Sequence, residues 1–334
     1  MKIDNFVRII DGRLITTPPI DAFATICLDV SRISHGDLFI DTTASRDFIH
    51  QALAKGAYAI VTTLSFANED DECAWIEVSS IEQILIKLLR YTITQKSLDI
   101  TLLSPVQESL LEMIQTPKNI KRLRGDLYAF ARTVLGAKEE ERFCLSDNIL
   151  AAQIAPVANT VATSLHVKPV IMSKGLFLSS FSHQERYYAE QKTPLCFVEE
   201  LLCLLNFCDM YEIGYNLEHL GFCEHFYPQF ITHALCKKEF GSSDKVLIFA
   251  SLASLLPALL TYMKAYIEST HIILCLPRNF QHTIPFDGEI LLFDSVEELA
   301  VLSQKSFQYA LILGDKEAYE PLFIKTFTTQ PSLF

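Results

Sequence analysis

The chain has 334 residues, half of them hydrophobic and a fifth charged, which is enough for two or three domains with cores of their own. Acidic side chains outnumber basic ones by 40 to 28, and the formal net charge of −12 disfavours a phosphate-tracking surface. Nucleic acid is therefore not an expected partner. The longest apolar stretch, 246–260, is shorter than the ~20 residues of a bilayer span, and the first residues lack a signal-peptide pattern. We expect a cytoplasmic protein without a membrane span.

The first 96 residues are expected to form a small α/β domain. A shorter helix over 49–55 should end at Gly56 in the left-handed conformation, and the segment 80–94 repeats apolar residues at three- and four-residue spacing. That spacing predicts an amphipathic helix packed on a sheet. Short β-rich runs predict strands at 25–28, 37–40, 57–62 and 73–78.

A middle domain over 97–240 has a weaker pattern, which does not define its topology. Helices are predicted over 107–115 and 198–209. Aromatic residues at 177–181 and 185–188 favour two strands of a hairpin that turns around 182–184.

The last part, 241–334, alternates strands and helices, and its strands are continuous apolar runs, which is typical of a mostly parallel sheet covered on both faces. We therefore predict a Rossmann-like domain. Its strands are expected at 245–249, 271–276, 289–293 and 309–313, and its helices at 255–268 and 296–303.

Nine cysteines lie in apolar segments without a disulfide framework, so we expect reduced, buried thiols. The densest group could suggest zinc, but Cys203 and Cys208 would point to different faces of a helix and no Cys-x-x-Cys pair occurs. No metal site is predicted from this group, which comprises Cys196, Cys203, Cys208, Cys223, His219 and His225. His225 follows Glu224, yet adjacent residues rarely face each other and aromatic neighbours indicate a packed core. No catalytic residue and no cofactor is expected.

Two motifs near the start carry a resemblance. Leu28 to Asp41 reads LDVSRISHGDLFID, and Asp47 to Val61 reads DFIHQALAKGAYAIV. Their order and spacing resemble the opening domain of the Mur ligases, especially those that add later residues of the peptidoglycan stem peptide. That family has Asp-Ser-Arg before a Gly-Asp-Leu-Phe turn. Here Val30 replaces the aspartate, and Ser31 and Arg32 match the other two positions.

In the Mur ligases the opening domain holds the UDP end of a sugar nucleotide. The resemblance therefore makes Ser31 and Arg32 candidate UDP-sugar contacts, with Thr42 and Asp47 as further candidates. The intervening loop, 42–46, is shorter than the family's loop and lacks its glycines. A serine and an arginine at a strand-to-turn junction can also simply cap and solvate it.

The family's second domain opens with a strand and a Gly-x-x-Gly-Lys-Thr loop, whose amides cradle the phosphates of ATP. Gln107, Glu108 and Ser109 stand at the matching place, where a glutamate would repel phosphate. The 11 glycines are so spaced that no two lie closer than Gly214 and Gly221, so no glycine cradle can be written on the chain.

The end of the chain resembles the family's carboxy-terminal domain more weakly. In that domain a helix precedes a strand that enters a Lys-Gly-Ser turn. Here Leu313, Gly314 and Asp315 take the place of the turn, so its basic and hydroxyl residues are missing. The resemblance at both ends implies an α/β, three-domain, Mur-ligase-like architecture with a reduced middle domain.

These observations favour a non-catalytic Mur-ligase-like protein. Its expected partner is UDP-MurNAc-peptide, another cell-wall precursor, a Mur enzyme or a scaffold protein. Two alternatives stay open. The chain could be an active ATP-dependent carboxylate–amine ligase with an altered phosphate site, or an enzyme of unrelated chemistry on the inherited scaffold.

Overall fold

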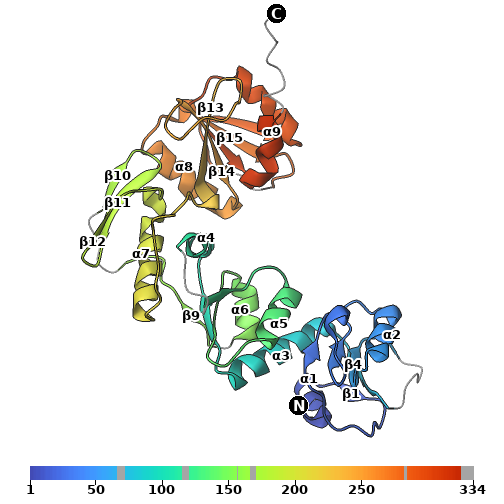
Figure 1. Cartoon of the computed structure of the whole chain (residues 1–334). Coiled ribbons are helices and arrows are strands. Elements are labelled where there is room, and N and C mark those ends of the chain that lie inside the picture. Colours follow the sequence, from blue (N-terminus) through green and yellow to red (C-terminus); the bar gives the residue numbers. More distant parts are fainter. Residues whose placement is uncertain (66–71, 115–119, 156, 166–170, 282–283, 325–334) are drawn as a thin grey trace, which may run out of the picture. The chain divides into compact units, whose positions relative to one another are not determined.

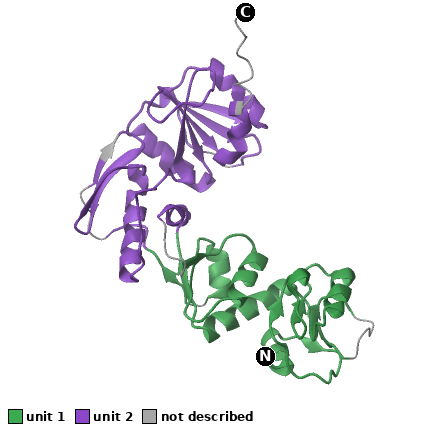
Figure 2. Ribbon diagram, viewed as in Figure 1, with its two compact units in different colours: residues 1–103, 117–161 green, residues 104–116, 162–334 purple. Residues whose placement is uncertain are grey.

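The computed structural model describes residues 1–65, 72–114, 120–155, 157–165, 171–281 and 284–324. The chain divides into two compact units (Figure 2), each of which is described by itself. Unit 1 comprises Met1–Leu103 and Pro117–Val161, and unit 2 comprises Ser104–Thr116 and Ala162–Phe334. Within the described residues, no helix is both long and apolar enough to span a bilayer.

Unit 1 begins with a five-stranded sheet in which β2, β3, β4 and β5 are parallel and β1 is antiparallel to β5. The four predicted strands are all present, each one shorter than its predicted range. In their order across the sheet the strands are β1 (Arg13–Leu14), β5 (Ala74–Glu77), β4 (Ala59–Thr62), β3 (Leu38–Ile40) and β2 (Ile26–Cys27).

Three helices accompany this sheet (Figure 1): α1 (Ile3–Ile10), α2 (Arg46–Ala54) and α3 (Ile81–Gln95). The hydroxyl of Ser80 accepts a hydrogen bond from the Gln83 amide and so caps the predicted amphipathic helix α3. The sequence pattern did not reveal α1. Its apolar positions Ile3, Phe6 and Ile10 are nevertheless spaced three and four residues apart and are buried.

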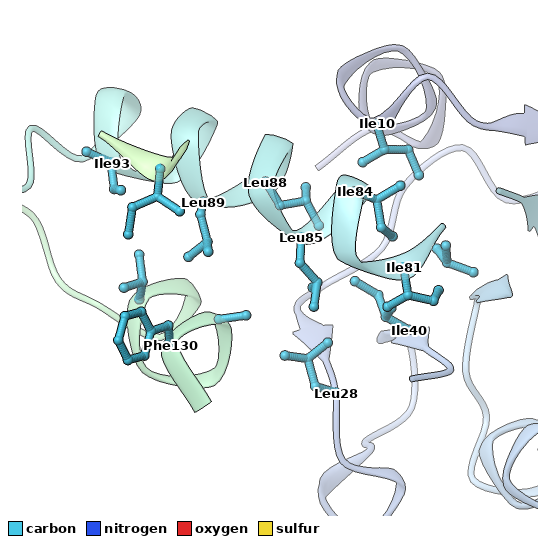
Figure 3. Close-up of a cluster of buried hydrophobic side chains, with 14 of the residues drawn as sticks. Ile10, Leu28, Ile40, Ile81, Ile84, Leu85, Leu88, Leu89, Ile93 and Phe130 are labelled. Carbon is cyan, nitrogen blue, oxygen red and sulfur yellow. The ribbon is translucent and has the colours of Figure 1, made fainter. Parts of the chain in front are cut away.

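The second sheet of unit 1 is parallel and smaller. Its strands lie in the order β7 (Ile120–Arg122), β8 (Arg142–Leu145), β6 (Asp99–Leu102) and β9 (Asn159–Thr160). Its helices are α5 (Leu127–Leu135) and α6 (Asn148–Ile154). Helix α3 joins the two sheets into one core, because its buried face meets Leu28 and Ile40 of the first sheet region and Phe130 of α5 (Figure 3). One helix therefore holds unit 1 together.

Unit 2 contains the helix α4 (Pro105–Met113), although the neighbouring strands β6 and β7 belong to unit 1. The helix predicted over 107–115 is thus present and begins two residues earlier, while Gln115 lies outside the described residues. It packs against α7 (Leu195–Met210), the helix predicted over 198–209.

An antiparallel three-stranded sheet also contacts α7. It consists of β10 (Ile171–Lys174), β11 (Leu178–His183) and β12 (Arg186–Gln191). The predicted hairpin is confirmed, but its turn was placed too early. His183 pairs with Arg186, so Gln184 and Glu185 form a two-residue turn instead of residues 182–184.

The carboxy-terminal part of unit 2 is a five-stranded sheet, which is parallel except for its edge strand β13, as predicted. Pro228 lies in β13, where the edge position tolerates a residue without an amide hydrogen. The strand order is β13 (Tyr227–Ile231), β14 (Lys245–Ala250), β17 (Tyr309–Leu313), β15 (Ile272–Pro277) and β16 (Glu289–Phe293). The connecting helices include α8 (Leu256–Lys264) and α9 (Glu320–Ile324).

One helix of this sheet has a tighter winding than an α-helix. The segment predicted as a helix over 296–303 is the 3-10 helix η5 (Val296–Gln304). Its two buried side chains, Leu299 and Leu302, are three residues apart and fully covered. A 3-10 helix has three residues per turn and stacks such a pair on one face, which explains why this winding satisfies the core.

The glycine predicted to end the second helix has a measurable role. Gly56 has a φ of +83°, and a Cβ at this position would lie 2.5 Å from His35 Nδ1. Replacing Gly56 with alanine should cost about 2 kcal/mol, since the left-handed conformation alone costs roughly 1–2 kcal/mol for an L-residue. Urea unfolding followed by the fluorescence of Trp75, the chain's single tryptophan, will measure the loss. Gly136→Ala is the control, because its φ is −83° and a Cβ would meet nothing closer than 3.6 Å.

Candidate functional site

A cavity of about 580 Å³ lies in unit 1 beside the segment that carries the Ser-Arg motif. Residues 23–29 and Arg32 form one wall. The last turns of α3 form another, and the end of α5 with Gly136 completes the lining. The volume lies within the range of small-molecule sites, which is about 300–1,000 Å³.

Three separate elements bring positive charge to this cavity. Arg32 comes from the 3-10 helix η1 (Val30–Arg32), Lys96 from the end of α3, and Arg132 from α5. Asp29 is the one acidic side chain among the described residues of the lining. In a chain whose net charge is −12, this local excess of cations favours an anionic ligand.

Lys96 is fixed in place at the wall of the cavity. Its Nζ donates hydrogen bonds to the carbonyl oxygens of Leu135 at 3.1 Å and Ala137 at 2.6 Å. These bonds join the end of α3 to the end of α5. The charge of Lys96 is therefore held by carbonyls, while Arg32 and Arg132 are exposed to solvent.

Asp29, Ser31 and Arg32 form a local cap at the mouth of the cavity. The Asp29 carboxylate accepts hydrogen bonds from the Ser31 amide at 2.9 Å and the Ser31 hydroxyl at 2.7 Å. The bonds from Ser31 hold the pKa of Asp29 below its ordinary value, so the group is an anion at neutral pH. Arg32 Nε lies 3.9 Å from Asp29 Oδ2, and the Arg32 side chain remains 83% exposed.

Asp37, the aspartate of the Gly-Asp-Leu-Phe turn, forms hydrogen bonds with the segment that lines the cavity. It is 4% exposed and accepts hydrogen bonds from the Thr25 amide at 3.2 Å, the Thr25 hydroxyl at 2.7 Å and the Ser34 amide at 2.9 Å. Burial acts to raise the pKa of Asp37, but these hydrogen bonds outweigh it and hold the pKa below its ordinary value. The motif therefore shapes the strand that lines the cavity.

The four residues predicted as ligand contacts do not come together. Arg32 lines the cavity, and Ser31 adjoins it with its hydroxyl engaged by Asp29. Thr42 and Asp47 are not among the lining residues. Thr42 precedes α2, and Asp47 is exposed in the first turn of that helix.

Lys96 and Arg132 were not recognised from the sequence. Each is a single basic residue on or beside a helix. The two lie far apart in the sequence, so no short motif contains both. The helix that carries Arg132 was itself not predicted. Only the packing of α5 against α3 brings the two cations to the same cavity.

The residues at the predicted phosphate-loop position lie in the first turn of α4. Ser104 Oγ accepts from the Gln107 amide at 3.0 Å, and Gln107 Oε1 accepts from the Ser104 amide at 3.0 Å. This reciprocal pair is a capping box. The amide of Glu108 donates to Ser104 O at 2.9 Å. Gln107, Glu108 and Ser109 are all buried.

His225 is buried next to this turn within unit 2. Its Nε2 lies 3.2 Å from Pro105 O, so this nitrogen donates, and its Nδ1 is in hydrogen-bond contact with Ser251 Oγ. Burial lowers the pKa of His225, which keeps the ring neutral at pH 7. Glu224 Oε1 is 3.9 Å away. Both ring nitrogens are thus used in holding neighbouring segments.

Two features singled out from the sequence remain, the cysteines and the turn at Gly314. All nine cysteines are free thiols, and within the described residues no group of three or more metal-binding side chains gathers. At the end of β17, Gly314 has a φ of +147° and lies against the ring of Tyr319. The Tyr319 hydroxyl donates to Leu313 O at 3.0 Å, so an aromatic side chain packs the turn.

Three solved structures share the fold along nearly their whole length. MurF ligase from Thermotoga maritima, solved in complex with ADP, is 12% identical, with 92% of this chain and 98% of that chain covered and a TM-score of 0.55. MurF from Acinetobacter baumannii is 10% identical, with 97% and 98% covered and a TM-score of 0.52.

A further structure from Acinetobacter baumannii, UDP-N-acetylmuramoylalanyl-D-glutamyl-2,6-diaminopimelate–D-alanyl-D-alanyl ligase, is 10% identical, with 98% of each chain covered and a TM-score of 0.52. No protein-family model and no curated protein matches the sequence. The structural likeness confirms the predicted α/β architecture: the chain has the fold of the Mur ligases.

Proposed function

We propose that this chain is a non-catalytic protein of the Mur ligase fold that binds a UDP-linked peptidoglycan precursor in the cavity beside Arg32. The observation that carries the proposal is the meeting of three cations at a cavity of about 580 Å³. A nucleotide sugar brings a diphosphate, and guanidinium groups bind phosphate through paired hydrogen bonds. We retain a three-domain division at 1–96, 97–240 and 241–334 as part of this proposal.

The start of α4 supports the non-catalytic part. Phosphate loops bind through unpaired backbone amides. Here Ser104 engages the amides of Gln107 and Glu108, through its hydroxyl and its carbonyl oxygen respectively. Glu108 is an acidic residue at the position that the resemblance assigns to the Gly-Lys-Thr loop. The Thermotoga maritima neighbour binds ADP, whereas we expect this chain not to bind it. A protein that binds a precursor without converting it would act together with a Mur enzyme or a scaffold protein, and we include such a partner in the proposal.

Thermal unfolding with UDP-MurNAc-peptide and, separately, with Mg-ATP tests the proposal. The precursor should stabilise the protein, by about 2.7 kcal/mol at a hundred times its Kd, and Mg-ATP should leave the melting temperature unchanged. Arg32→Ala should weaken precursor binding by about 10- to 100-fold, the value of a charged hydrogen bond. Arg46→Ala is the matched control, since Arg46 is an exposed arginine of α2 away from the cavity.

Each outcome bears on one part of the proposal. Stabilisation by Mg-ATP would contradict the non-catalytic part and favour an active ligase with an altered phosphate site. If the precursor leaves the melting temperature unchanged, the binding part of the proposal is contradicted. A precursor shift of equal size in wild type and Arg32→Ala would show that the site lies elsewhere.

A further inference from the structure

Unit 2 contains a second cavity, of about 340 Å³, at the turn end of the β11–β12 hairpin. The hairpin turn forms one side, and the last turn of α7 with the segment that follows it forms the other. This volume is near the lower end of small-molecule sites and suits one or two sugar-sized rings. The cavity shares no residue with the one beside Arg32.

A polar cluster of one buried and two half-buried side chains lines this cavity. His183 is 7% exposed, and its Nε2 donates to Asp209 Oδ2 at 2.7 Å. The Tyr215 hydroxyl also hydrogen-bonds Asp209, and burial together with that carboxylate raises the pKa of Tyr215. The hydroxyl therefore stays protonated and donates. With these two donors the Asp209 carboxylate is held in place, and the cluster connects the hairpin to the helix.

The backbone at the rim is held in a costly conformation. Gln184 has a φ of 51° and Glu212 a φ of 54°, and both line the cavity although neither is glycine. The turn at Glu212 is built by hydrogen bonds from its own amide to Asp209 O at 3.2 Å and from the Ile213 amide to Cys208 O at 2.7 Å. Such conformations persist where the surroundings impose them, and they gather at binding sites.

The remaining lining groups define the chemistry of the ligand. Gln184 supplies a donor and an acceptor, Arg186 supplies donors, and Glu212 supplies an acceptor. Arg186 contributes a positive charge, and Asp209 and Glu212 contribute carboxylates, unlike the cation-rich cavity beside Arg32. Tyr188 and Tyr215 add aromatic faces, whose negative potential attracts polarised C–H groups.

A neutral molecule with many hydroxyl groups and an apolar ring face satisfies all of these groups at once. We propose that this cavity is a saccharide-binding site. The ring packs on the tyrosines, and its hydroxyls pair with Gln184, Arg186 and Glu212. This site is separate from the nucleotide-sugar cavity, so either one can fail in experiment without the other.

Saturation-transfer difference NMR on the full chain tests the site with four probes: D-glucose, D-galactose, D-mannose and N-acetyl-D-glucosamine. We expect at least one sugar to receive saturation, with a Kd on the order of 1 mM, and Glu212→Gln and Tyr188→Ala to weaken it about tenfold. Tyr187→Ala is the matched control. Tyr187 is the neighbouring residue of β12, is 58% exposed and does not line the cavity.

Tyr188 packs on Phe181, with ring centroids 5.5 Å apart, so Tyr188→Ala could disturb the hairpin. Glu212→Gln keeps the size of the side chain. If Tyr188→Ala lowers the melting temperature, the test of sugar binding rests on Glu212→Gln alone. Saturation of no sugar, or equal saturation in wild type and Glu212→Gln, would overturn the proposal. Preferential binding of free glycine or acetate over every sugar would overturn the assignment to saccharides.

Discussion

Replacing Leu85 with alanine is expected to lower the free energy of unfolding of unit 1 by about 2–5 kcal/mol, the usual cost of truncating a fully buried leucine. Leu85 is 0% exposed and lies in the second turn of α3 (Figure 3). It belongs to a core cluster that includes residues of both sheets of the unit, so the void left by the truncation should close only in part. Trp75 lies in β5 of unit 1 and is 2% exposed, so urea unfolding followed by its fluorescence reports this unit.

Gln83→Ala provides the control on the same helix. Gln83 is exposed, and alanine is the better helix former, so its effect should stay within about 0.5 kcal/mol. Equal losses for Leu85→Ala and Gln83→Ala would contradict the role given to α3 as the element that joins the two sheets.

The same helix connects the stability of unit 1 to its cavity. The first turns of α3 supply core residues such as Leu85, while its end supplies Tyr91, Gln95 and Lys96 to the cavity wall. Lys96 then donates hydrogen bonds to carbonyl oxygens at the end of α5 and just after it. A loss of packing along α3 should therefore also displace the cations that we assign to ligand binding.

Periodicity made α3 and the parallel sheets predictable. The alternation of apolar and polar residues at 80–94 has the helical period, and continuous apolar runs such as β14 and β15 occur where both faces of a sheet are covered. These signals are local in the sequence. The end of α2 at Gly56 was predictable for the same reason, because the position after a helix often takes the left-handed conformation, which favours glycine.

The middle of the chain and the cavity were not predictable in this way. Strand β13 contains a proline, which in a sequence argues against a strand, yet an edge strand accommodates it. Strands β7 and β9 have only three and two residues, too short for any period to show. The cavity depends on Arg32 and Arg132, which tertiary packing brings to one lining and no spacing rule connects.

The motif that resembles the Mur ligases includes one cationic residue of the cavity lining, whose role as a ligand contact stays a prediction. Its Ser-Arg pair led to Arg32, while the aspartate of its turn, Asp37, was taken only as part of the pattern. The structure gives Asp37 a physical role, since its carboxylate accepts hydrogen bonds from Thr25, which lines the cavity, and from Ser34. The motif singles out Asp37 by its position in the sequence, and the hydrogen bonds explain how this residue stabilises the segment that lines the cavity.

Replacing Asp37 with alanine should therefore destabilise unit 1 by about 3 kcal/mol, because it removes three hydrogen bonds to a buried, charged acceptor. The pKa of Asp37 is lower in the folded protein than the ordinary 3.8. A carboxylate of this kind stabilises the fold fully above its unfolded pKa, and the contribution is lost as the pH falls through the folded pKa.

The difference in unfolding free energy between wild type and Asp37→Asn should accordingly be constant from pH 8 to 5 and shrink below about pH 4. Urea unfolding followed by Trp75 fluorescence across this range measures it. Asp21→Asn is the control, because the Asp21 side chain is 85% exposed and its ion pair with Lys2 is a surface pair worth about 0–1 kcal/mol. A difference that persists undiminished at pH 3 would mean that shape rather than charge makes Asp37 the anchor of the cavity wall.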